Sequence, residues 1–297
     1  MAPDGTSAPY HLLPFRFKRI EGIDRVLLVN EVGESAFVME ETLDQLAHGI
    51  PISDEAEAHD LRSKQFICVE DLDTSLRLLS TKYRSKKSFL RGGQSLHIFV
   101  VTLRCDHSCS YCQVSRVAEG ATGYDMSSAT ASSAVDRLFE TRSNNLTVEF
   151  QGGEPLLAFE RIKEVVTNCT ERAATENRRV RFTMTTTLHH ATESVLSFLK
   201  EHNFHISVSI DGPDALHNHA RVLKTGDSAS LTRSAIERAR AILGPNRVSS
   251  ITTLTRYGLF KIEEVIDHLV DLDFKALFLR PLSPHGFAVK SWRKIGY

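Results

Sequence analysis

From Leu96 onward, the pattern of apolar and polar positions changes repeatedly along the chain. Short runs in which every second residue is apolar predict strands, and longer stretches with helical apolar spacing predict helices. The predicted strands are 96–103, 146–151, 180–187, 205–210, 248–254 and 275–280. The predicted helices are 127–142, 158–176, 191–202, 231–243 and 261–272, with Ser127 or Ser128 and Thr192 as helix-start residues. Alternating strands and helices predict an α/β fold of right-handed βαβ units around an open, barrel-like parallel sheet.

The predicted strands have one apolar and one polar face. In the second strand, Leu146 and Val148 point to one side, and Thr147 and Glu149 point to the other. Strands 180–187 and 205–210 alternate in the same way. A parallel sheet covered on both sides is normally apolar on both faces, so a polar face indicates a lumen that holds water and a polar ligand. In α/β barrels the chemistry lies at the carboxyl ends of the strands.

The part of the chain before Leu96 has a different texture. Residues 1–11 are rich in proline, serine, glycine and alanine and are predicted to be disordered. Residues 12–72 predict a small α+β module, which either packs as a structural element or holds a peptide along a strand edge. Residues 73–94 are polar and basic and predict a linker, which leaves 95–297 for the barrel.

Composition narrows the classes of partner and compartment. The chain has 297 residues, 41% hydrophobic and 25% charged, with a formal net charge of −1. This balance is typical of a globular protein and gives no reason to expect nucleic acid or an anionic membrane as a partner. No segment resembles a secretory signal or a membrane span, and the cysteine count of five is odd. Together these features predict a reducing, cytoplasmic location.

Three cysteines, Cys105, Cys109 and Cys112, directly follow the first predicted strand. Three thiolates bind three of the four irons of an iron–sulfur cubane and leave one iron open, as a catalytic metal site requires. The alternative is a zinc site completed by His107 or by a distant cysteine. Cys68 and Cys169 stand alone and are predicted to be buried as small apolar residues.

Two further motifs end the second and fourth predicted strands. In the first, Gly152 and Gly153 let the backbone approach a ligand, and Glu154 offers a carboxylate to a cationic group such as an ammonium. In the second, Ser209 is placed to bond a ribose hydroxyl, and Arg221 is placed to bind a carboxylate. The alternatives are an ordinary tight turn and a surface helix with a salt bridge. The pattern of the thirteen histidines marks none of them as a catalytic base.

Taken in this order, the three cysteines, the Gly-Gly-Glu-Pro turn and the Ser-x-Asp-Gly-Pro strand end resemble the radical S-adenosylmethionine (SAM) enzymes over about residues 96–280. The resemblance implies a partial (β/α)6 TIM-like barrel, a [4Fe-4S] cluster and SAM. It further implies that SAM is cleaved reductively to methionine and a 5′-deoxyadenosyl radical, which abstracts hydrogen from a substrate. The residues that the resemblance assigns are Cys105, Cys109 and Cys112 for the cluster, Gly152, Gly153 and Glu154 for the SAM amino group, Ser209 for the ribose, Arg221 for the carboxylate, and Tyr111 near the adenine.

Finer features resemble the His-Xaa-Ser system maturases, which belong to the peptide-modifying, SPASM-type branch. They are the segments Leu13–Phe17, Phe99–Cys105 and Phe278–Leu282. This resemblance implies a small ribosomally made peptide as substrate, a peptide-recognition role for the N-terminal module, and an electron donor such as flavodoxin or ferredoxin.

The sequence departs from that pattern at three places. Asn218 stands where the family usually has Asp, and Thr185–Leu188 stands where many relatives have Thr-Asn-Gly. No cysteine follows Cys169, so the cysteine-rich C-terminal extension of that branch is absent. Two alternatives stay open, an anaerobic sulfatase-type maturase and a shortened peptide-binding form without catalysis. The missing extension supports the second of these.

Overall fold

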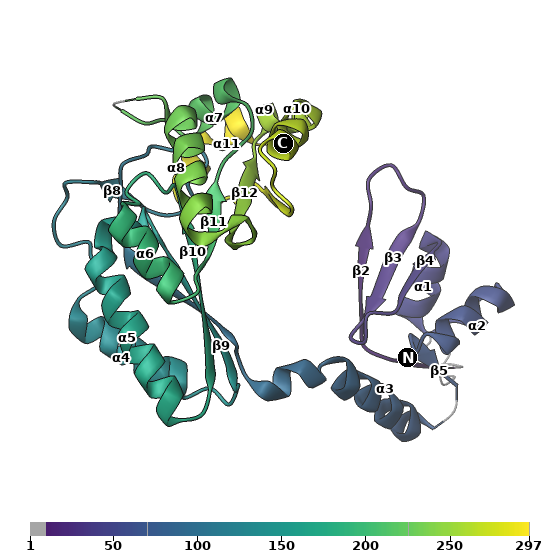
Figure 1. Ribbon diagram of the computed structural model, residues 1–297. Coiled ribbons are helices and arrows are strands. Elements are labelled where there is room, and N and C mark those ends of the chain that lie inside the picture. Colours follow the sequence, from purple (N-terminus) through teal and green to yellow (C-terminus); the bar gives the residue numbers. More distant parts are fainter. Residues whose placement is uncertain (1–9, 70, 225, 297) are drawn as a thin grey trace. The chain divides into compact units, whose positions relative to one another are not determined.

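The computed structural model describes residues 10–69, 71–224 and 226–296. The chain divides into two compact units, Met1–Arg91 and Gly92–Tyr297, called here the N-terminal unit and the barrel unit (Figure 1). Most of the segment predicted to be disordered lies outside the described residues. Its last two residues are ordered in the fold, because Tyr10 is buried and its hydroxyl donates to the Ile50 carbonyl over 2.8 Å.

The N-terminal unit is built on a small antiparallel sheet. Its strands, in the order β2-β3-β4, are β2 (Phe15–Arg19), β3 (Val26–Asn30) and β4 (Ser35–Val38). Its remaining elements are the pair β1 (His11–Leu12) and β5 (Ile67–Cys68) and the helices α1 (Glu40–His48) and α2 (Glu55–Ser63). Asp54 caps α2, and α1 ends at Gly49, whose left-handed φ of 66° favours glycine.

The residues predicted as a linker are largely helical, in α3 (Leu72–Lys86) and the 3₁₀ helix η1 (Ser88–Gly92). The Asp71 side chain caps α3 by accepting from the backbone N–H groups of Asp73 and Thr74. The buried Leu79 packs with Leu13 and with Cys68, which is buried as expected. This packing gives the charged segment a fixed place in the N-terminal unit.

The barrel unit contains one six-stranded sheet whose strands follow the chain in the order β13-β12-β11-β10-β9-β6. All five pairings are parallel. The strands are β6 (Leu96–Thr102), β9 (Asn145–Gly152), β10 (Arg179–Thr186), β11 (His205–Ser209), β12 (Val248–Leu254) and β13 (Leu277–Pro281). Because β6 and β13 remain edges, the sheet is not closed, and the α/β prediction of a partial TIM-like barrel is confirmed.

Helices between the strands cover one face of this sheet (Figure 1). The helices are α4 (Ser128–Phe139), α5 (Phe159–Thr175), α6 (Glu193–Glu201), α7 (Asp214–Ala220), α8 (Ser228–Leu243), α9 (Arg256–Phe260) and α10 (Ile262–Asp271). The last helix, α11 (Ala288–Ile295), follows β13 and packs near the cysteine loop, with Ile295 in one cluster with Tyr111. The 3₁₀ helices η2 (Pro155–Ala158) and η3 (Pro245–Arg247) and the short pair β7 (Arg104–Cys105) and β8 (Val117–Ala118) complete the unit. Ser127 caps α4 and Thr192 caps α6, as predicted.

The two faces of the sheet differ as the alternation predicts. Phe150 and Met184 are fully buried against the helices, whereas Glu149 and Thr185 on the opposite face are half-buried. The edge strand β6 departs from this pattern, because Ile98 pairs with Glu149 and is 52% exposed. The lumen is therefore polar along its central strands and apolar at this edge. Among the described residues, no helix is both long and apolar enough to cross a lipid bilayer.

Candidate functional site

The cysteine loop lies at the carboxyl ends of the strands. Cys105 ends β7, and the loop is fastened by two backbone bonds, from the Ser108 N–H to the Val222 carbonyl at 2.8 Å and from the Ser110 N–H to the Ala220 carbonyl at 2.9 Å. All five cysteines are free thiols. One cavity is lined by all nine residues that the sequence assigned to the cluster and to SAM, namely Cys105, Cys109, Cys112, Tyr111, Gly152, Gly153, Glu154, Ser209 and Arg221.

Gly152 and Gly153 are required by packing between neighbouring strands. A Cβ atom at Gly152 would overlap the Thr102 carbonyl oxygen, and one at Gly153 would overlap that of Arg104. Gly152 also has a φ of 151°, which side chains rarely adopt. The Gly153 N–H donates to the Thr102 carbonyl over 2.9 Å. The close approach expected of these glycines is therefore made to the backbone of β6 and β7, and it fixes the wall of the cavity.

Glu154 is only 1% exposed, and four donors already bind its carboxylate. Oε1 accepts from the Leu156 N–H at 3.1 Å and from the Thr186 hydroxyl at 2.6 Å. Oε2 accepts from the N–H and the hydroxyl of Thr187, both at 2.9 Å. A carboxylate has about four acceptor sites, so any ligand ammonium must share one of these. The Thr185–Leu188 segment that departs from the family pattern therefore holds Glu154 in place.

Arg221 also lines this cavity, and it lies in a buried charged group. Its Nη1 donates to the Tyr111 hydroxyl over 2.7 Å, and that hydroxyl donates to Asp211 Oδ2 over 2.5 Å. Burial raises the pKa of Asp211 and of Tyr111, while the positive charge of Arg221 opposes both shifts. The buried Nε of Arg221 has no hydrogen-bond partner among the residues that the structure describes. Such an orphaned cationic donor fits an anionic ligand in the cavity.

Four histidines, none of which the sequence marks as a catalytic base, gather beside the cysteine loop. They are His107, His189, His190 and His217, which are brought together around Asp106 and Ser228. Burial lowers the pKa of His217 to about 2 and that of His189 to about 4. The four residues come from three separate segments of the chain, so no spacing in the sequence could have grouped them. The sole available signal was the position of His217 just after the Asp-Gly-Pro turn.

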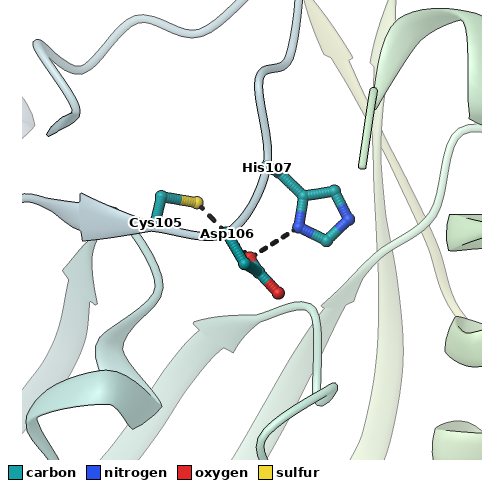
Figure 2. Close-up of side chains that lie close together, drawn as sticks. All are labelled: Cys105, Asp106 and His107. Carbon is teal, nitrogen blue, oxygen red and sulfur yellow. Dashed lines mark hydrogen bonds and ion pairs between the residues drawn. The ribbon is translucent and has the colours of Figure 1, made fainter. Parts of the chain in front are cut away.

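The positions of the ligand atoms distinguish between a zinc ion and an iron–sulfur cubane at the three thiols. A single zinc ion needs its ligand atoms close together, whereas a cubane binds each thiolate at a different iron. Among the described residues, the group of ligand atoms within 4.8 Å of one another is Cys105, Asp106 and His107, which contains one thiol (Figure 2). His107 is unsuited to a metal, because Nδ1 faces Asp106 at 2.7 Å and Nε2 faces Ser228 at 2.8 Å. The three separate thiols therefore fit the cluster.

Burial raises the pKa of the Cys109 thiol to about 11 and raises that of Cys105 further. Bound iron would have to offset this effect, because the ligand form of cysteine is the thiolate.

Residues 99–269 match the family model described as the radical SAM superfamily. This match covers more than half of the chain. The chain belongs to the radical SAM superfamily. Its cofactors are accordingly an iron–sulfur cluster and SAM, for which the three thiols and the Arg221 wall provide suitable ligands.

The chain is also similar to individual proteins and to a solved structure. An uncharacterized protein of Methanocaldococcus jannaschii is 28% identical over 63% of this chain and 62% of its own. A cysteine-type anaerobic sulfatase-maturating enzyme of Clostridium perfringens is 27% identical over 64% of this chain and 52% of its own. The solved structure "Native anSMEcpe with bound AdoMet and Cp18Cys peptide" has a TM-score of 0.55 at 23% identity, covering 63% of this chain and 50% of that one, which supports the fold. The chain thus spans between half and two thirds of the length of these relatives.

Proposed function

We propose that this radical SAM protein is a maturase that modifies a ribosomally made peptide, of the His-Xaa-Ser type that the finer sequence features resemble. The observation that carries the proposal is the convergence of three free thiols, the Gly152–Glu154 turn and the buried Arg221 on one cavity. The cofactors together supply a radical that abstracts hydrogen from the substrate. The protein supplies the binding groups and the exclusion of water.

In this proposal, each wall of the cavity binds a different part of SAM. Arg221 pairs with the carboxylate, because its buried Nε–H has no hydrogen-bond partner among the described residues and can donate to a ligand. The Gly152–Glu154 turn holds the amino group at the edge of the Glu154 carboxylate. Ser209 lies on the lumen face of β11 for the ribose, and the ring of Tyr111 lies against the adenine while its hydroxyl stays with Asp211.

A peptide substrate is supported by the named relatives and by the N-terminal unit. The sulfatase-maturating enzymes act on a protein, and the solved neighbour holds a peptide. In the N-terminal unit, β2 pairs with β3 and is an edge of its sheet. A free strand edge can bind an extended peptide by backbone hydrogen bonds, and we propose this role for the unit. We also propose a flavodoxin or ferredoxin as the electron donor.

The cluster is tested first, by anaerobic reconstitution with iron and sulfide. Cys109→Ala is expected to abolish cluster loading, whereas Cys169→Ala, a matched change in the α5 core, retains it. The readouts are iron content and the visible charge-transfer absorption. Equal iron in both variants, or a colourless protein that takes up one zinc ion, would refute the proposal.

The reaction is tested next, with the reduced and reconstituted chain. The proposal expects 5′-deoxyadenosine from SAM, and a mass change in a peptide that contains the His-Xaa-Ser sequence. A chain that holds a reduced cluster but forms no 5′-deoxyadenosine would instead be a peptide-binding form without catalysis.

A second candidate is an anaerobic sulfatase-type maturase, which the names of the curated relatives favour. It predicts oxidation of a Cys or Ser in a sulfatase-derived peptide. Offering both peptides in one assay, read by mass spectrometry, separates the two candidates.

A further inference from the structure

A buried line of hydrogen bonds connects the cysteine loop to the end of the fourth barrel strand. The Asp106 Oδ1 lies 2.7 Å from His107 Nδ1 (Figure 2). His107 Nε2 lies 2.8 Å from the Ser228 hydroxyl. The same hydroxyl lies 2.9 Å from His217 Nε2, and His217 Nδ1 accepts from the Asp211 N–H at 3.3 Å. These groups are called here the Ser228 network. His107 and His217 are fully buried, and Ser228 is 1% exposed.

The Asp211 backbone N–H determines which atom donates in each hydrogen bond of the Ser228 network. A backbone N–H can only donate, so His217 Nδ1 is an acceptor, and neutral His217 carries its proton on Nε2. That Nε2–H donates to the Ser228 oxygen, which leaves the serine proton for His107 Nε2. His107 then carries its proton on Nδ1 and donates it to Asp106. A charged His107 would leave the buried serine proton without an acceptor in this line.

The end of the Ser228 network lies against the cluster site. Asp106 Oδ1, which receives the last proton, is 3.7 Å from the Cys105 sulfur. The other oxygen, Oδ2, faces His190 Nε2 at 3.1 Å and His189 Nδ1 at 3.8 Å. Hydrogen bonds thus hold both oxygens of the carboxylate, and its charge has a fixed position next to a ligand sulfur.

We propose that Asp106 sets the reduction potential of the cluster, and that Ser228 and His217 are positioning residues that keep its carboxylate beside Cys105. A negative charge close to a cluster disfavours the addition of an electron, so the carboxylate lowers the potential. Neighbouring groups of this kind are a recognised means of tuning a metal site. The inference requires the iron–sulfur cluster and does not depend on the identity of the peptide substrate.

The test is a redox titration of the reconstituted full-length chain without SAM, followed by the EPR signal of the reduced cluster. Asp106→Asn is expected to raise the midpoint potential, because it removes the charge and keeps the shape. Ser228→Ala is expected to raise it by a smaller amount, because the carboxylate loses its fixed orientation. Ser230→Ala is the matched control, since Ser230 is an exposed serine of the same helical turn, and it should leave the potential unchanged.

A double variant distinguishes positioning from a general loss of structure. On the Asp106→Asn background, Ser228→Ala is expected to cause no further shift. In the chain that keeps Asp106, Ser228→Thr preserves the hydroxyl and should leave the potential at its wild-type value. His217→Gln interrupts the same line and substitutes for Ser228→Ala if that variant does not fold. An unchanged potential in Asp106→Asn, or equal shifts from Ser228→Ala on both backgrounds, would overturn the proposal.

Discussion

Two buried charges, Glu154 and Arg221, line the same cavity, and the protein satisfies their hydrogen bonds to different degrees. Glu154 is bound by four donors, one from η2 and three from the end of β10. Arg221 donates to Tyr111 from Nη1 but keeps a buried Nε with no partner among the described residues. A guanidinium has five N–H donors, so this wall is incomplete without a ligand.

This difference separates a structural charge from a binding charge. Removing a partner from a satisfied buried group destabilises the fold, because donors are left unpaired. Removing a group that awaits a ligand mainly weakens ligand binding. We therefore expect the Glu154 side to determine stability and the Arg221 side to determine affinity, although both were predicted from the sequence as contacts to SAM.

The largest effect is expected from Glu154→Gln. The new amide group places an N–H against groups that can only donate or that already donate, so buried donors lose their acceptor. Each buried donor left unpaired costs about 1–3 kcal/mol, so the free energy of unfolding should fall by about 3 kcal/mol. Urea denaturation of the cluster-free chain measures this change. Glu149→Gln is the control. Glu149 lies on the preceding strand β9 and is half-buried, so the change should affect stability much less. Equal losses in the two variants would contradict the structural role of Glu154.

Arg221→Lys should act on affinity. Lysine keeps the positive charge but lacks the planar set of N–H donors. The binding free energy for SAM should weaken by about 2 kcal/mol, which raises the Kd roughly thirtyfold. Calorimetric titration of the cluster-loaded chain tests this. Arg116→Lys changes another guanidinium that lines the cavity and serves as the control. If Arg221→Lys leaves the Kd unchanged, the Arg221 wall is not the carboxylate site.

The protonation of His217, which lies close enough to Arg221 to feel its charge, should make the stability of the chain depend on pH. Burial, reinforced by the charge of Arg221, lowers its pKa from 6.5 to about 2. Below pH 6.5 the unfolded chain therefore binds a proton that the folded chain does not, and stability falls as the pH falls, by about 2 kcal/mol between pH 6.5 and 5. His217→Gln should flatten this slope, whereas the exposed His285→Gln should keep it. Thermal unfolding between pH 7 and 5 provides the measurement.

The smallest effect is expected from Thr187→Val. The change removes one hydroxyl donor to Glu154 and keeps the backbone N–H, at a cost of about 1 kcal/mol. The Kd for SAM should stay within about twofold of wild type, since Arg221 is untouched. A large loss of affinity in this variant would show that the two walls are not separable.

Much of the fold could be predicted from the sequence, because strand alternation and helical spacing are local signals. The six barrel strands, the caps at Ser127 and Thr192, and the polar face beside Glu149 all follow from neighbouring residues. The gathering of nine candidate residues on one cavity follows from motifs at strand ends.

The partners of those motifs could not be predicted, because they lie far apart in the chain. Ser228 joins His107 to His217 through side chains, and no local pattern encodes such a contact. Leu188 adopts a left-handed φ of 62° just after the threonines that hold Glu154, although such a conformation disfavours leucine. Tertiary contacts impose both features, so they are visible only in the folded chain.

The fastening of the cysteine loop to Ala220 and Val222 has a consequence for biosynthesis. The first βα unit leaves the ribosome with all three thiols, but the backbone partners that shape their loop are translated much later. A nascent chain that stops before Ala220 thus carries the three thiols without the two carbonyl groups that hold their loop in shape. Metallation in the cell should therefore follow translation of the fourth unit, and stalled chains of increasing length should acquire iron only beyond that point.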